Sequence, residues 1–345
     1  MRAPAQTILS DADLPALLAR LDLVPSGTAL EVEPAGDGNI NWVRRVRSSA
    51  GASWIVKQAR PRLERFPEYG APTERILCER RYFEIAAPLD EDGVIPEVLG
   101  FDEVDRVLVL ADLGGAERLD HALARGARVT PALESVARLL GRVHAATRDP
   151  ALTARFPNDE MRRLHGDHIF VLPLRPNDFP LPAALRARAH ALSADPGFVA
   201  LADAAYARYL EPRGALVHAD VQGGNILLTA SGPKLLDAEI SHVGDPAFDV
   251  GTLVAHVLLG GIGRGEVAAR GSDVAALWDA YGSSTQDPPR FAAVARYAGL
   301  EILRRTVGAA RVAAVAEADA AVAALDLACR LVRTPPEAAE EVELP

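Results

Sequence analysis

Cysteine is scarce in this chain, and long apolar runs are absent. Cys78 and Cys329 are its only two cysteines and lie far apart, so we expect no disulfide framework and a reducing compartment. Met1 to Asp13 lacks the apolar core of a signal peptide. The longest apolar run, Val250 to Ile262, is too short and too rich in glycine to span a bilayer. These absences predict a cytoplasmic protein that does not contact a membrane.

An excess of positive charge is also missing. The formal net charge of -10 argues against nucleic acid or an anionic membrane as the main partner, although a local basic pocket for phosphates remains compatible with it. The hydrophobic fraction of 49% and the charged fraction of 24% are ordinary for a globular enzyme. A chain of 345 residues exceeds the usual size of one domain, so two lobes are expected.

Two common nucleotide-binding motifs are lacking. Neither Gly-x-x-x-x-Gly-Lys-Ser/Thr nor Gly-x-Gly-x-x-Gly occurs, which excludes Walker and Rossmann sites. The first third of the chain instead has a strand-like texture, after a short helix within 13–23. We expect a five-stranded antiparallel sheet with one helix at 73–87, its strands near 29–34, 42–47, 53–57, 96–100 and 106–110. This lobe, residues 1–112, ends at a hinge-like turn, Asp112-Leu-Gly-Gly115.

The second lobe, residues 113–334, is predicted to be mainly helical. Its helices are expected at 117–126, 131–148, 182–194, 197–210, 248–259, 266–282, 290–310 and 316–332, interrupted by strands near 215–217, 226–228 and 234–236. The last residues, 335–345, are acidic and led by proline, and we expect them to be disordered. The fold class is therefore α+β with two lobes.

One stretch of the second lobe carries the spacing of a phosphoryl-transfer site. It reads His218-Ala-Asp220-Val-Gln-Gly-Gly-Asn225, and Asp237-Ala-Glu239 follows twelve residues later. Asp220 is expected to orient the attacking hydroxyl and accept its proton. Asn225 and Asp237 are expected to hold Mg²⁺, with Glu239 as a second metal ligand or an outer carboxylate. The alternatives, a turn-capping Asp and a solvated turn Glu, are less favoured because the acidic groups are in register.

The first lobe offers a matching lysine. Lys57 ends the strand Trp54-Ile-Val-Lys57, where it can contact nucleotide phosphates, and Glu79 on the following helix can pair with it. A strand-end lysine alone would more often be a solvated residue. Gly38 and Asn39, in the turn Gly36-Asp-Gly-Asn-Ile-Asn41, can cover phosphates with backbone N–H groups, the alternative being a plain hairpin turn.

Together these motifs resemble the aminoglycoside phosphotransferase and choline kinase superfamily. His-x-Asp-x-x-x-x-Asn and the later Gly-Asp-Pro-Ala-Phe-Asp, ending at Asp249, carry the resemblance. It implies a protein-kinase-like fold, use of ATP and Mg²⁺, and a nucleotide-binding position at Asp112. His218 and Asp249 are interpreted as structural support for the catalytic loop. A protein kinase would show Ala-Pro-Glu after the motif, and this sequence has none.

Within that superfamily the chain looks most like the 5-methylthioribose kinases. The features are the turn ending at Asn41, Val56-Lys-Gln58-Ala, Asp237-x-Glu239 and Arg304-Arg305-Thr-Val-Gly308. The resemblance implies transfer of the ATP γ-phosphate to the anomeric hydroxyl of a 5-substituted ribose, with Arg304 and Arg305 at the substrate. The alternative is that these arginines make surface ion pairs. Family members often form dimers, so a homodimer is compatible with the resemblance.

Departures from that family keep two rivals open. Ala219, Gln222 and Asn225 stand where the family usually has Gly, His and often Ser. An antibiotic or nucleoside phosphotransferase is the nearest alternative, although cationic aminoglycosides would need acidic groups where this chain has two arginines. A non-catalytic pseudokinase is the second, and the filled catalytic positions argue against it. The stretch from Leu164 to Phe170, with Asp167 and His168, is interpreted as a substrate-facing insertion.

Overall fold

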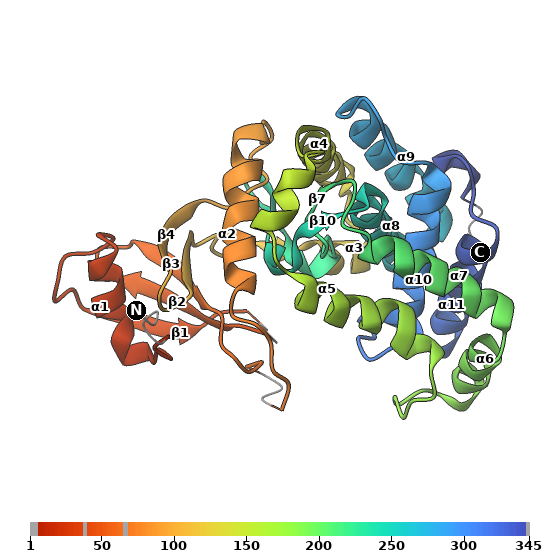
Figure 1. Ribbon diagram of the computed structural model, residues 1–345, viewed down its shortest axis with the longest axis horizontal. Helices are drawn as coiled ribbons and strands as arrows, with labels where there is room; N and C mark the ends of the chain where they lie inside the picture. The colour runs from red at the N-terminus through yellow and green to blue at the C-terminus, as the bar shows by residue number, and fades with distance from the viewer. Residues whose placement is uncertain (1–5, 37–39, 65–67, 343–345) are drawn as a thin grey trace.

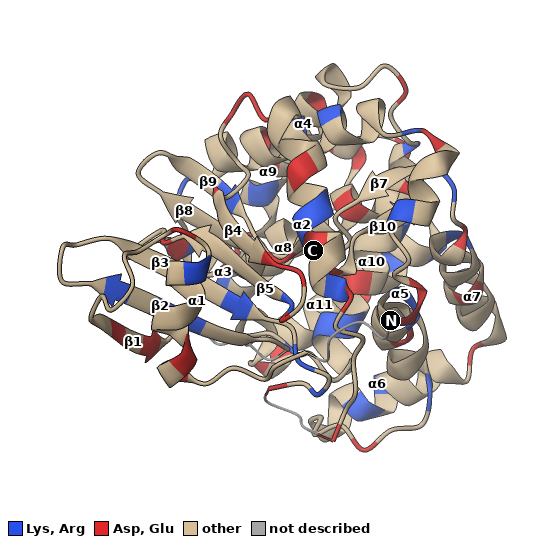
Figure 2. Cartoon of the chain, turned by 60° about the vertical axis from the view of Figure 1, so that its left-hand side comes forward, with Lys and Arg blue, Asp and Glu red and all other residues tan. Residues whose placement is uncertain are grey.

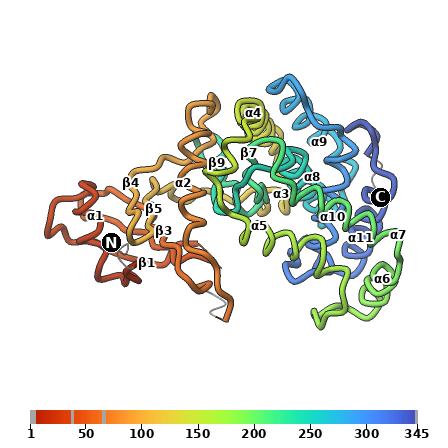
Figure 3. The backbone as a smooth tube through the Cα atoms, viewed as in Figure 1, coloured from red at the N-terminus to blue at the C-terminus, as the bar shows by residue number. Residues whose placement is uncertain are grey.

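The computed structural model describes residues 6–36, 40–64 and 68–342. A sheet-containing lobe lies at one end and a larger helical lobe at the other, and the chain passes between them through residues 112–116 (Figure 1). Helices α1 and α11 therefore lie at opposite ends of the molecule (Figure 3). This arrangement confirms the predicted α+β, kinase-like fold.

The first lobe is built on a five-stranded antiparallel sheet. Its order is β1-β2-β3-β5-β4, and its strands are β1 (Leu30–Pro34), β2 (Trp42–Ser48), β3 (Ser53–Gln58), β4 (Val98–Asp102) and β5 (Val107–Ala111). Because β-strand side chains alternate between faces, Val107 and Val109 pack towards α1 (Leu14–Arg20), while Leu108 and Leu110 join the main core on the side of α2 (Arg75–Ala86). Both faces are thus covered, which explains the uninterrupted apolar run of β5.

The same alternation sets the direction of Lys57 on β3. Val56 is fully buried in the cluster beneath α1. Its neighbour Lys57 must therefore point to the opposite face, where α2 lies. Strand pairing places Lys57 opposite Val43 on β2 and Leu108 on β5, so the ammonium group emerges from the centre of the sheet.

The second lobe packs helices around α8 (Pro246–Arg264), most of whose residues are buried. Around it lie α3 (Leu119–Ala124), α4 (Thr130–Ala146), α5 (Asp159–Gly166), α6 (Ala183–Ser193), α7 (Pro196–Leu210), α9 (Val267–Ser283), α10 (Phe291–Val307) and α11 (Ala318–Arg333). Helices α8 and α10 approach closely at Gly251, where an added Cβ would lie 2.7 Å from the Val294 carbonyl oxygen. Among the described residues, α8 alone has the length and apolar composition of a membrane span, and 89% of that window is buried inside the protein.

Short strands shape the edge of the helical lobe that faces the sheet. β6 (Glu117–Arg118), β8 (Ile226–Thr229) and β9 (Gly232–Leu235) form one small sheet, and β7 (Ala215–Val217) pairs with β10 (His242–Gly244). The loop between β7 and β8 and the segment after β9 are thereby brought together. Acidic and basic residues are interspersed over both lobes rather than separated by sign (Figure 2).

Two predicted segments differ in the structure. Residues 335–342 were expected to be disordered, but they include a short 3₁₀ helix, Ala339–Glu341. The segment is ordered because Ala339 and Val342 are buried beside α9. The expected insertion at 164–170 is instead the end of α5 and a π-helical turn, Asp167–Val171. Its Phe170 is buried against the rings of Tyr206 and Phe248, which makes this segment part of the core.

Candidate active site

The loop after β7 is hydrogen-bonded to a buried carboxylate, that of Asp249. Asp249, near the start of α8, accepts the backbone N–H groups of His218 at 2.7 Å and Ala219 at 2.8 Å. Its other contact is His144 Nε2, at 3.1 Å. Burial raises the pKa of Asp249, but the hydrogen bond and charge of His144 outweigh burial and hold the pKa below its usual value. The loop is therefore anchored to the most buried helix of the lobe.

Within the loop, the ring of His218 contacts the loop backbone and Tyr82. Its Nδ1 accepts the backbone N–H of Asp220 at 3.2 Å, and the ring lies edge-on to Tyr82 of α2 at 5.1 Å between centroids. Burial lowers the pKa of His218 to about 4, so the ring is neutral at physiological pH. This neutral imidazole accepts a backbone hydrogen bond within the loop, as the expected structural position requires.

Asp220 lies at the centre of the site with 15% of its side chain exposed. Its Oδ2 accepts hydrogen bonds from Asn225 Nδ2 at 2.7 Å and from Gln222 Nε2 at 3.0 Å. Burial raises the pKa of Asp220 to about 6, against the opposing effect of the Arg304 and Arg305 charges. A carboxylate with this pKa is ionised at neutral pH and is more basic than a free aspartate, as a proton acceptor requires.

Asn225 and Asp237 lie on adjoining segments. The Leu236 N–H donates to the Asn225 carbonyl oxygen at 2.8 Å, which fixes Asp237 next to the loop. Asn225 turns its amide nitrogen towards Asp220, which leaves its amide oxygen available. Asp237 has a left-handed backbone, with φ of 63°, and 47% of its side chain is exposed. One carboxylate and one amide oxygen are the hard ligands that Mg²⁺ takes beside phosphate oxygens.

No group of three or more His, Cys, Asp or Glu side chains able to hold a metal exists within residues 6–36, 40–64 and 68–342. Mg²⁺ commonly binds through one or two carboxylates and completes its shell with substrate phosphates and water. The residues present therefore fit a nucleotide-bound Mg²⁺ rather than a metal caged by protein alone.

Lys57 joins the two lobes at this point. Its Nζ lies 2.8 Å from Glu79 Oε2 on α2 and 2.5 Å from Asp237 Oδ1. Burial by itself would lower the pKa of Lys57, but the two carboxylates raise it above its ordinary value, so the ammonium stays charged. Burial also raises the pKa of Glu79 to about 7, with Lys57 opposing that rise. Apart from Lys57, the sequence contains one lysine, Lys234, and all its other Lys-or-Arg positions are arginines.

The arginine pair from the last turn of α10 reaches the other side of Asp220. Arg305 donates from Nη2 to Gln222 Oε1 at 2.7 Å, and Gln222 in turn donates to Asp220. Both arginines are balanced by Glu301, which lies 2.6 Å from Arg305 Nε and 3.2 Å from Arg304 Nη1. They are mostly buried and are not surface ion pairs, since 12% of the Arg304 and 8% of the Arg305 side chain is exposed.

His165 is a site residue that the sequence interpretation missed. Its Nε2 lies 3.2 Å from Arg304 Nη1 and 3.9 Å from Asp220 Oδ1. Burial and the Arg304 charge hold the pKa of His165 well below its usual value, so Nε2 is an acceptor. Asp167, singled out instead, accepts a hydrogen bond from Tyr206 at 2.7 Å, away from Asp220. The four-residue spacing of buried Met161 and His165 is the helical signal that could have found it.

Two residues predicted at the nucleotide or the metal, Asp112 and Glu239, have ion-pair partners within the protein, and two more, Gly38 and Asn39, lie outside the described residues. The Asp112 carboxylate, expected at the nucleotide, binds Arg45 at 2.8 Å and the Ser53 hydroxyl at 2.6 Å, so it anchors the hinge turn. Glu239, expected at the metal, is buried against Arg75 at 3.2 Å. Gly38 and Asn39 fall within residues 37–39, which the structure does not describe.

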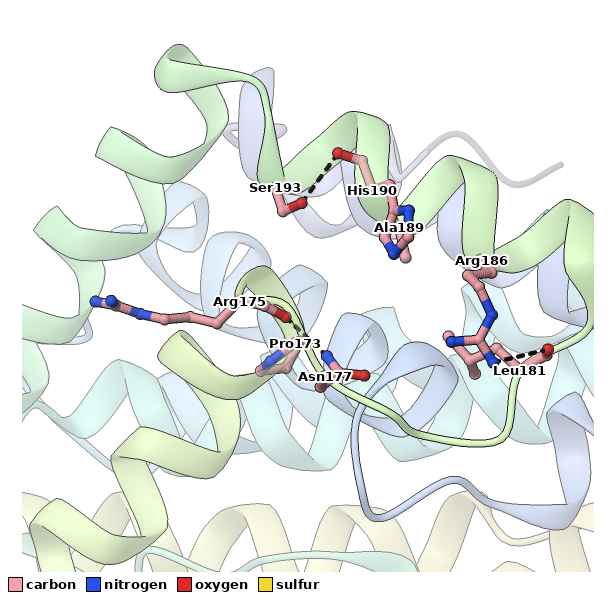
Figure 4. A pocket seen from close by; sticks show the side chains of 8 residues that line it. All are labelled: Pro173, Arg175, Asn177, Leu181, Arg186, Ala189, His190 and Ser193. Carbon is pink, nitrogen blue, oxygen red and sulfur yellow. Dashed lines mark hydrogen bonds between the residues drawn. The ribbon is translucent and has the colours of Figure 1, made fainter.

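A hollow beside α6 is separate from this cluster (Figure 4). It is lined by Arg175, Asn177 and Ser193 among others, and the side chains of Asn177 and Ser193 donate to backbone carbonyl groups. Asn177 Nδ2 donates to the Arg175 carbonyl at 2.9 Å, and Ser193 Oγ donates to the His190 carbonyl at 3.0 Å. None of the residues around Asp220 lines the hollow, so it takes no part in the site.

Solved structures of known proteins share this fold. A choline/ethanolamine kinase family protein from Mesorhizobium loti superimposes with a TM-score of 0.53 at 22% identity, covering 94% of this chain and 95% of that one. An ethanolamine kinase from Plasmodium vivax gives a TM-score of 0.55 at 13% identity, covering 96% and 92%. At these identities the likeness concerns the fold alone.

Relatives by sequence point in the same direction. Methylthioribose kinase of Yersinia pestis (strain Pestoides F) is 28% identical over 328 residues, which cover 81% of this chain and 78% of that protein. Methylthioribose kinase of Cronobacter sakazakii is 27% identical over 329 residues, covering 82% of each. Residues 31–294, which include Lys57, His165, Asp220, Asn225 and Asp237 but not Glu301, Arg304 and Arg305 on α10, match the phosphotransferase enzyme family, APH. The chain belongs to this phosphotransferase enzyme family and is a small-molecule kinase.

Proposed function

We propose that this kinase uses ATP and Mg²⁺ to phosphorylate a sugar hydroxyl, the anomeric hydroxyl of 5-methylthioribose or a related 5-substituted ribose. The observation that carries the proposal is the convergence of Arg304 and Arg305 on Asp220 through His165 and Gln222. Methylthioribose kinases among the relatives, at 27–28% identity, support the same acceptor class.

The phosphate side of the site would consist of Lys57, Asn225 and Asp237. Lys57 carries a full positive charge between the lobes and can move from Asp237 to a phosphate oxygen without leaving Glu79. Asn225 and Asp237 would hold Mg²⁺, which supplies neutralisation of charge on the transferred phosphoryl group. The residues thus position the phosphates and stabilise their charge, with no covalent intermediate on the protein.

Asp220 would act on the acceptor. Two amide N–H donors, from Asn225 and Gln222, fix its Oδ2 and leave Oδ1 towards the arginine side. In that position Oδ1 can accept a hydrogen bond from the attacking hydroxyl and take its proton as the bond to phosphorus forms. The raised pKa of Asp220, about 6, favours this proton transfer near neutral pH.

The acceptor side favours an uncharged, oxygen-rich molecule. Apart from Asp220 itself, two arginines face one balancing carboxylate, Glu301, so guanidinium groups rather than free carboxylates line this side. A polycationic aminoglycoside would meet repulsion there. Guanidinium N–H groups instead offer hydrogen-bond donors for sugar hydroxyls.

The test is ATP consumption with a panel of acceptors: 5-methylthioribose, ribose, nucleosides and aminoglycosides. We expect kcat/KM for 5-methylthioribose or another 5-substituted ribose to exceed that of the other classes by at least about tenfold, the discrimination one or two polar contacts supply. Phosphorylation of the anomeric hydroxyl would also remove the product's reducing-sugar reactivity. Preferred turnover of a nucleoside or an antibiotic would overturn the acceptor assignment.

A further inference from the structure

The Nε2 atom of His165 lies close to two charged groups of opposite sign. It is 3.2 Å from Arg304 Nη1 and 3.9 Å from Asp220 Oδ1. A guanidinium can only donate hydrogen bonds and a carboxylate can only accept them. One ring nitrogen therefore cannot bind both groups, because Arg304 requires a lone pair on Nε2 and Asp220 would require a proton. The shorter distance indicates that Nε2 accepts from Arg304.

The other ring nitrogen agrees with this assignment. Nδ1 of His165 lies 3.4 Å from the hydroxyl oxygen of Tyr209, a buried side chain on α7. Burial, together with the Arg304 charge, holds the pKa of His165 well below its usual value, so the ring carries a single proton. With that proton on Nδ1, the ring donates to Tyr209 and accepts from Arg304. Both ring nitrogens are thus used within the protein.

Packing fixes the position of the ring. His165 lies in the last turn of α5, and only 7% of its side chain is exposed. The ring meets that of Phe248 on α8 edge-on, with 6.0 Å between the centroids. Helices α5, α7 and α8 therefore hold the imidazole in place, with Nε2 facing Arg304 on α10.

Arg304 has a stronger potential partner nearby in Asp220. Burial raises the pKa of Asp220 and the Arg304 charge opposes that rise, so the two groups interact. No ion pair joins them, however, in the part of the chain that the structure describes. A hydrogen bond between two charged groups is stronger than one to a neutral imidazole, so a released Arg304 would favour the carboxylate.

Arg305 is held in a comparable way. Its Nη2 donates to the uncharged Oε1 of Gln222 at 2.7 Å. Each arginine next to Asp220 thus has a neutral acceptor that uses one of its N–H groups, His165 for Arg304 and Gln222 for Arg305. For Arg304, the imidazole is the group whose removal would leave an N–H free to bind the carboxylate.

We propose that His165 is a positioning residue, whose Nε2 holds the Arg304 guanidinium away from Asp220 and so keeps Asp220 Oδ1 free for the acceptor hydroxyl. Without this contact, Arg304 turns towards Asp220 and occupies Oδ1. The positioning role rests on the proposed action of Asp220 on the acceptor. It is independent of which acceptor binds.

The test is a matched pair of substitutions at His165. His165→Gln keeps an acceptor, because its amide oxygen can take the position of Nε2, whereas His165→Leu fills a similar volume with no acceptor. Both are compared with Arg304→Met and with the double variant that combines His165→Leu and Arg304→Met. For each protein, kcat and KM are measured with the best acceptor of the panel, folding is checked by thermal unfolding and ADP binding, and a crystal structure is determined.

We expect kcat to fall by about 10–100-fold in His165→Leu, because the acceptor hydroxyl must displace a charged donor from Oδ1. His165→Gln should keep kcat within about threefold of wild type, since the guanidinium retains a neutral acceptor. In the double variant, kcat should recover to within about threefold of that of Arg304→Met, while the acceptor KM stays as high as in Arg304→Met. The crystal structure of His165→Leu should show Arg304 hydrogen-bonded to Asp220.

A folded His165→Leu with the kcat of the wild type, or with Arg304 unmoved in the crystal, would overturn the proposal. A double variant whose kcat stays as low as that of His165→Leu would do so too, because His165 would then not act through Arg304. If His165→Leu does not fold, His165→Met takes its place, since a methionine side chain adapts to irregular core space.

A wild-type protein that turns over none of the acceptors would count against the proposed function instead. In that case the crystal structures of His165→Leu and His165→Gln still decide the positioning role. Arg304 bound to Asp220 in the first and not in the second supports it, and the same position of Arg304 in both contradicts it.

Discussion

Two buried clusters of charged side chains lie on either side of Asp220, and they differ in their ratio of carboxylates to cations. On the phosphate side, Lys57 contacts two carboxylates, Glu79 and Asp237. On the acceptor side, Arg304 and Arg305 share one carboxylate, Glu301. Apart from Asp220 itself, which lies between them, the first cluster has one more carboxylate than cations and the second has one more cation than carboxylates. This difference supports the proposed Mg²⁺ on one side and the proposed electron-rich acceptor on the other.

The clusters also differ in the exposure and the hydrogen-bond partners of their charged groups. Asp237 has 47% of its side chain exposed, so part of its carboxylate remains open to a ligand. On the acceptor side, Arg305 Nε and Nη2 bind Glu301 and Gln222. Arg304 Nε is buried without a hydrogen-bond partner in the part of the chain that the structure describes. The two clusters thus differ in exposure: a carboxylate is partly exposed on one side, and a guanidinium N–H is buried without a partner on the other.

Among changes within the two clusters, removal of the phosphate-side cation should have the largest effect. Lys57→Met leaves Glu79 and Asp237 without their shared counter-charge. We expect kcat to fall by about 10²–10³, the range found when one charge-stabilising donor is removed from an active site. The KM of the acceptor should stay within about twofold in steady-state kinetics, because the two clusters are separate. A variant in which the acceptor KM rises and kcat does not fall would contradict the division of roles.

The acceptor side should respond in the opposite way. Arg304→Met is expected to raise the acceptor KM by about 10–100-fold, since a hydrogen bond to a charged group is worth about 1.5–3 kcal/mol, and to leave the KM of ATP unchanged. Arg305→Met should act similarly through Gln222, which Arg305 contacts at 2.7 Å. Equal changes in both KM values would show that the arginines support the whole lobe rather than the acceptor.

The pH dependence of activity should report the pKa of Asp220. The ionised carboxylate is the active form, so activity is present above the pKa of about 6 and is lost as the pH falls through it. Arg304 lowers the pKa of Asp220, so Arg304→Met should move this acid limb upward by about one pH unit. The measurement is a kcat/KM profile from pH 5 to 8. An acid limb unchanged in Arg304→Met would place the titrating group elsewhere.

The smallest effect is expected at Ala219, between the two clusters. Its backbone has φ of 68°, a region that costs an L-residue about 1–2 kcal/mol. Ala219→Gly removes that cost, but the loss of a buried methyl group, worth about 0.8 kcal/mol, and greater freedom of the unfolded chain, worth about 0.4–1 kcal/mol, offset it. Calorimetry should find the unfolding midpoint within about 3 °C of wild type. A larger change would mean that Ala219 has a role beyond this turn.

The sequence predicted the elements of the fold better than the contacts within the site. Alternation in Val107–Leu110 and the strand ending at Lys57 sufficed for the five-stranded sheet, because strand periodicity is local information. Lys57 and Glu79 come together as predicted because sheet and helix order fixes their faces. Local pattern could not reveal that Ala339 and Val342 are buried, since an acidic, proline-led segment is usually solvated.

Two of the contacts that the sequence interpretation missed join distant segments. His165 and Arg304 are 139 residues apart, and Arg75 and Glu239 are 164 apart. Neither pair has a spacing that marks it, so only the packed lobes bring them together. The motif predicted where Glu239 lies, but its environment depends on Asn41 and Arg75 from the other lobe. Asp112 was likewise placed at the hinge by its turn, while its contact with Arg45 required the folded sheet.

We propose that Asp220 separates a nucleotide side from an acceptor side and acts on the acceptor hydroxyl. The direct test is Asp220→Ala, with turnover and Mg²⁺·ADP affinity measured on the same preparation. We expect turnover to fall by about 10²–10⁴, the contribution of a positioned general base, and the dissociation constant for ADP to stay within about threefold of wild type. Turnover close to that of the wild type, in a variant that still binds ADP, would contradict the account.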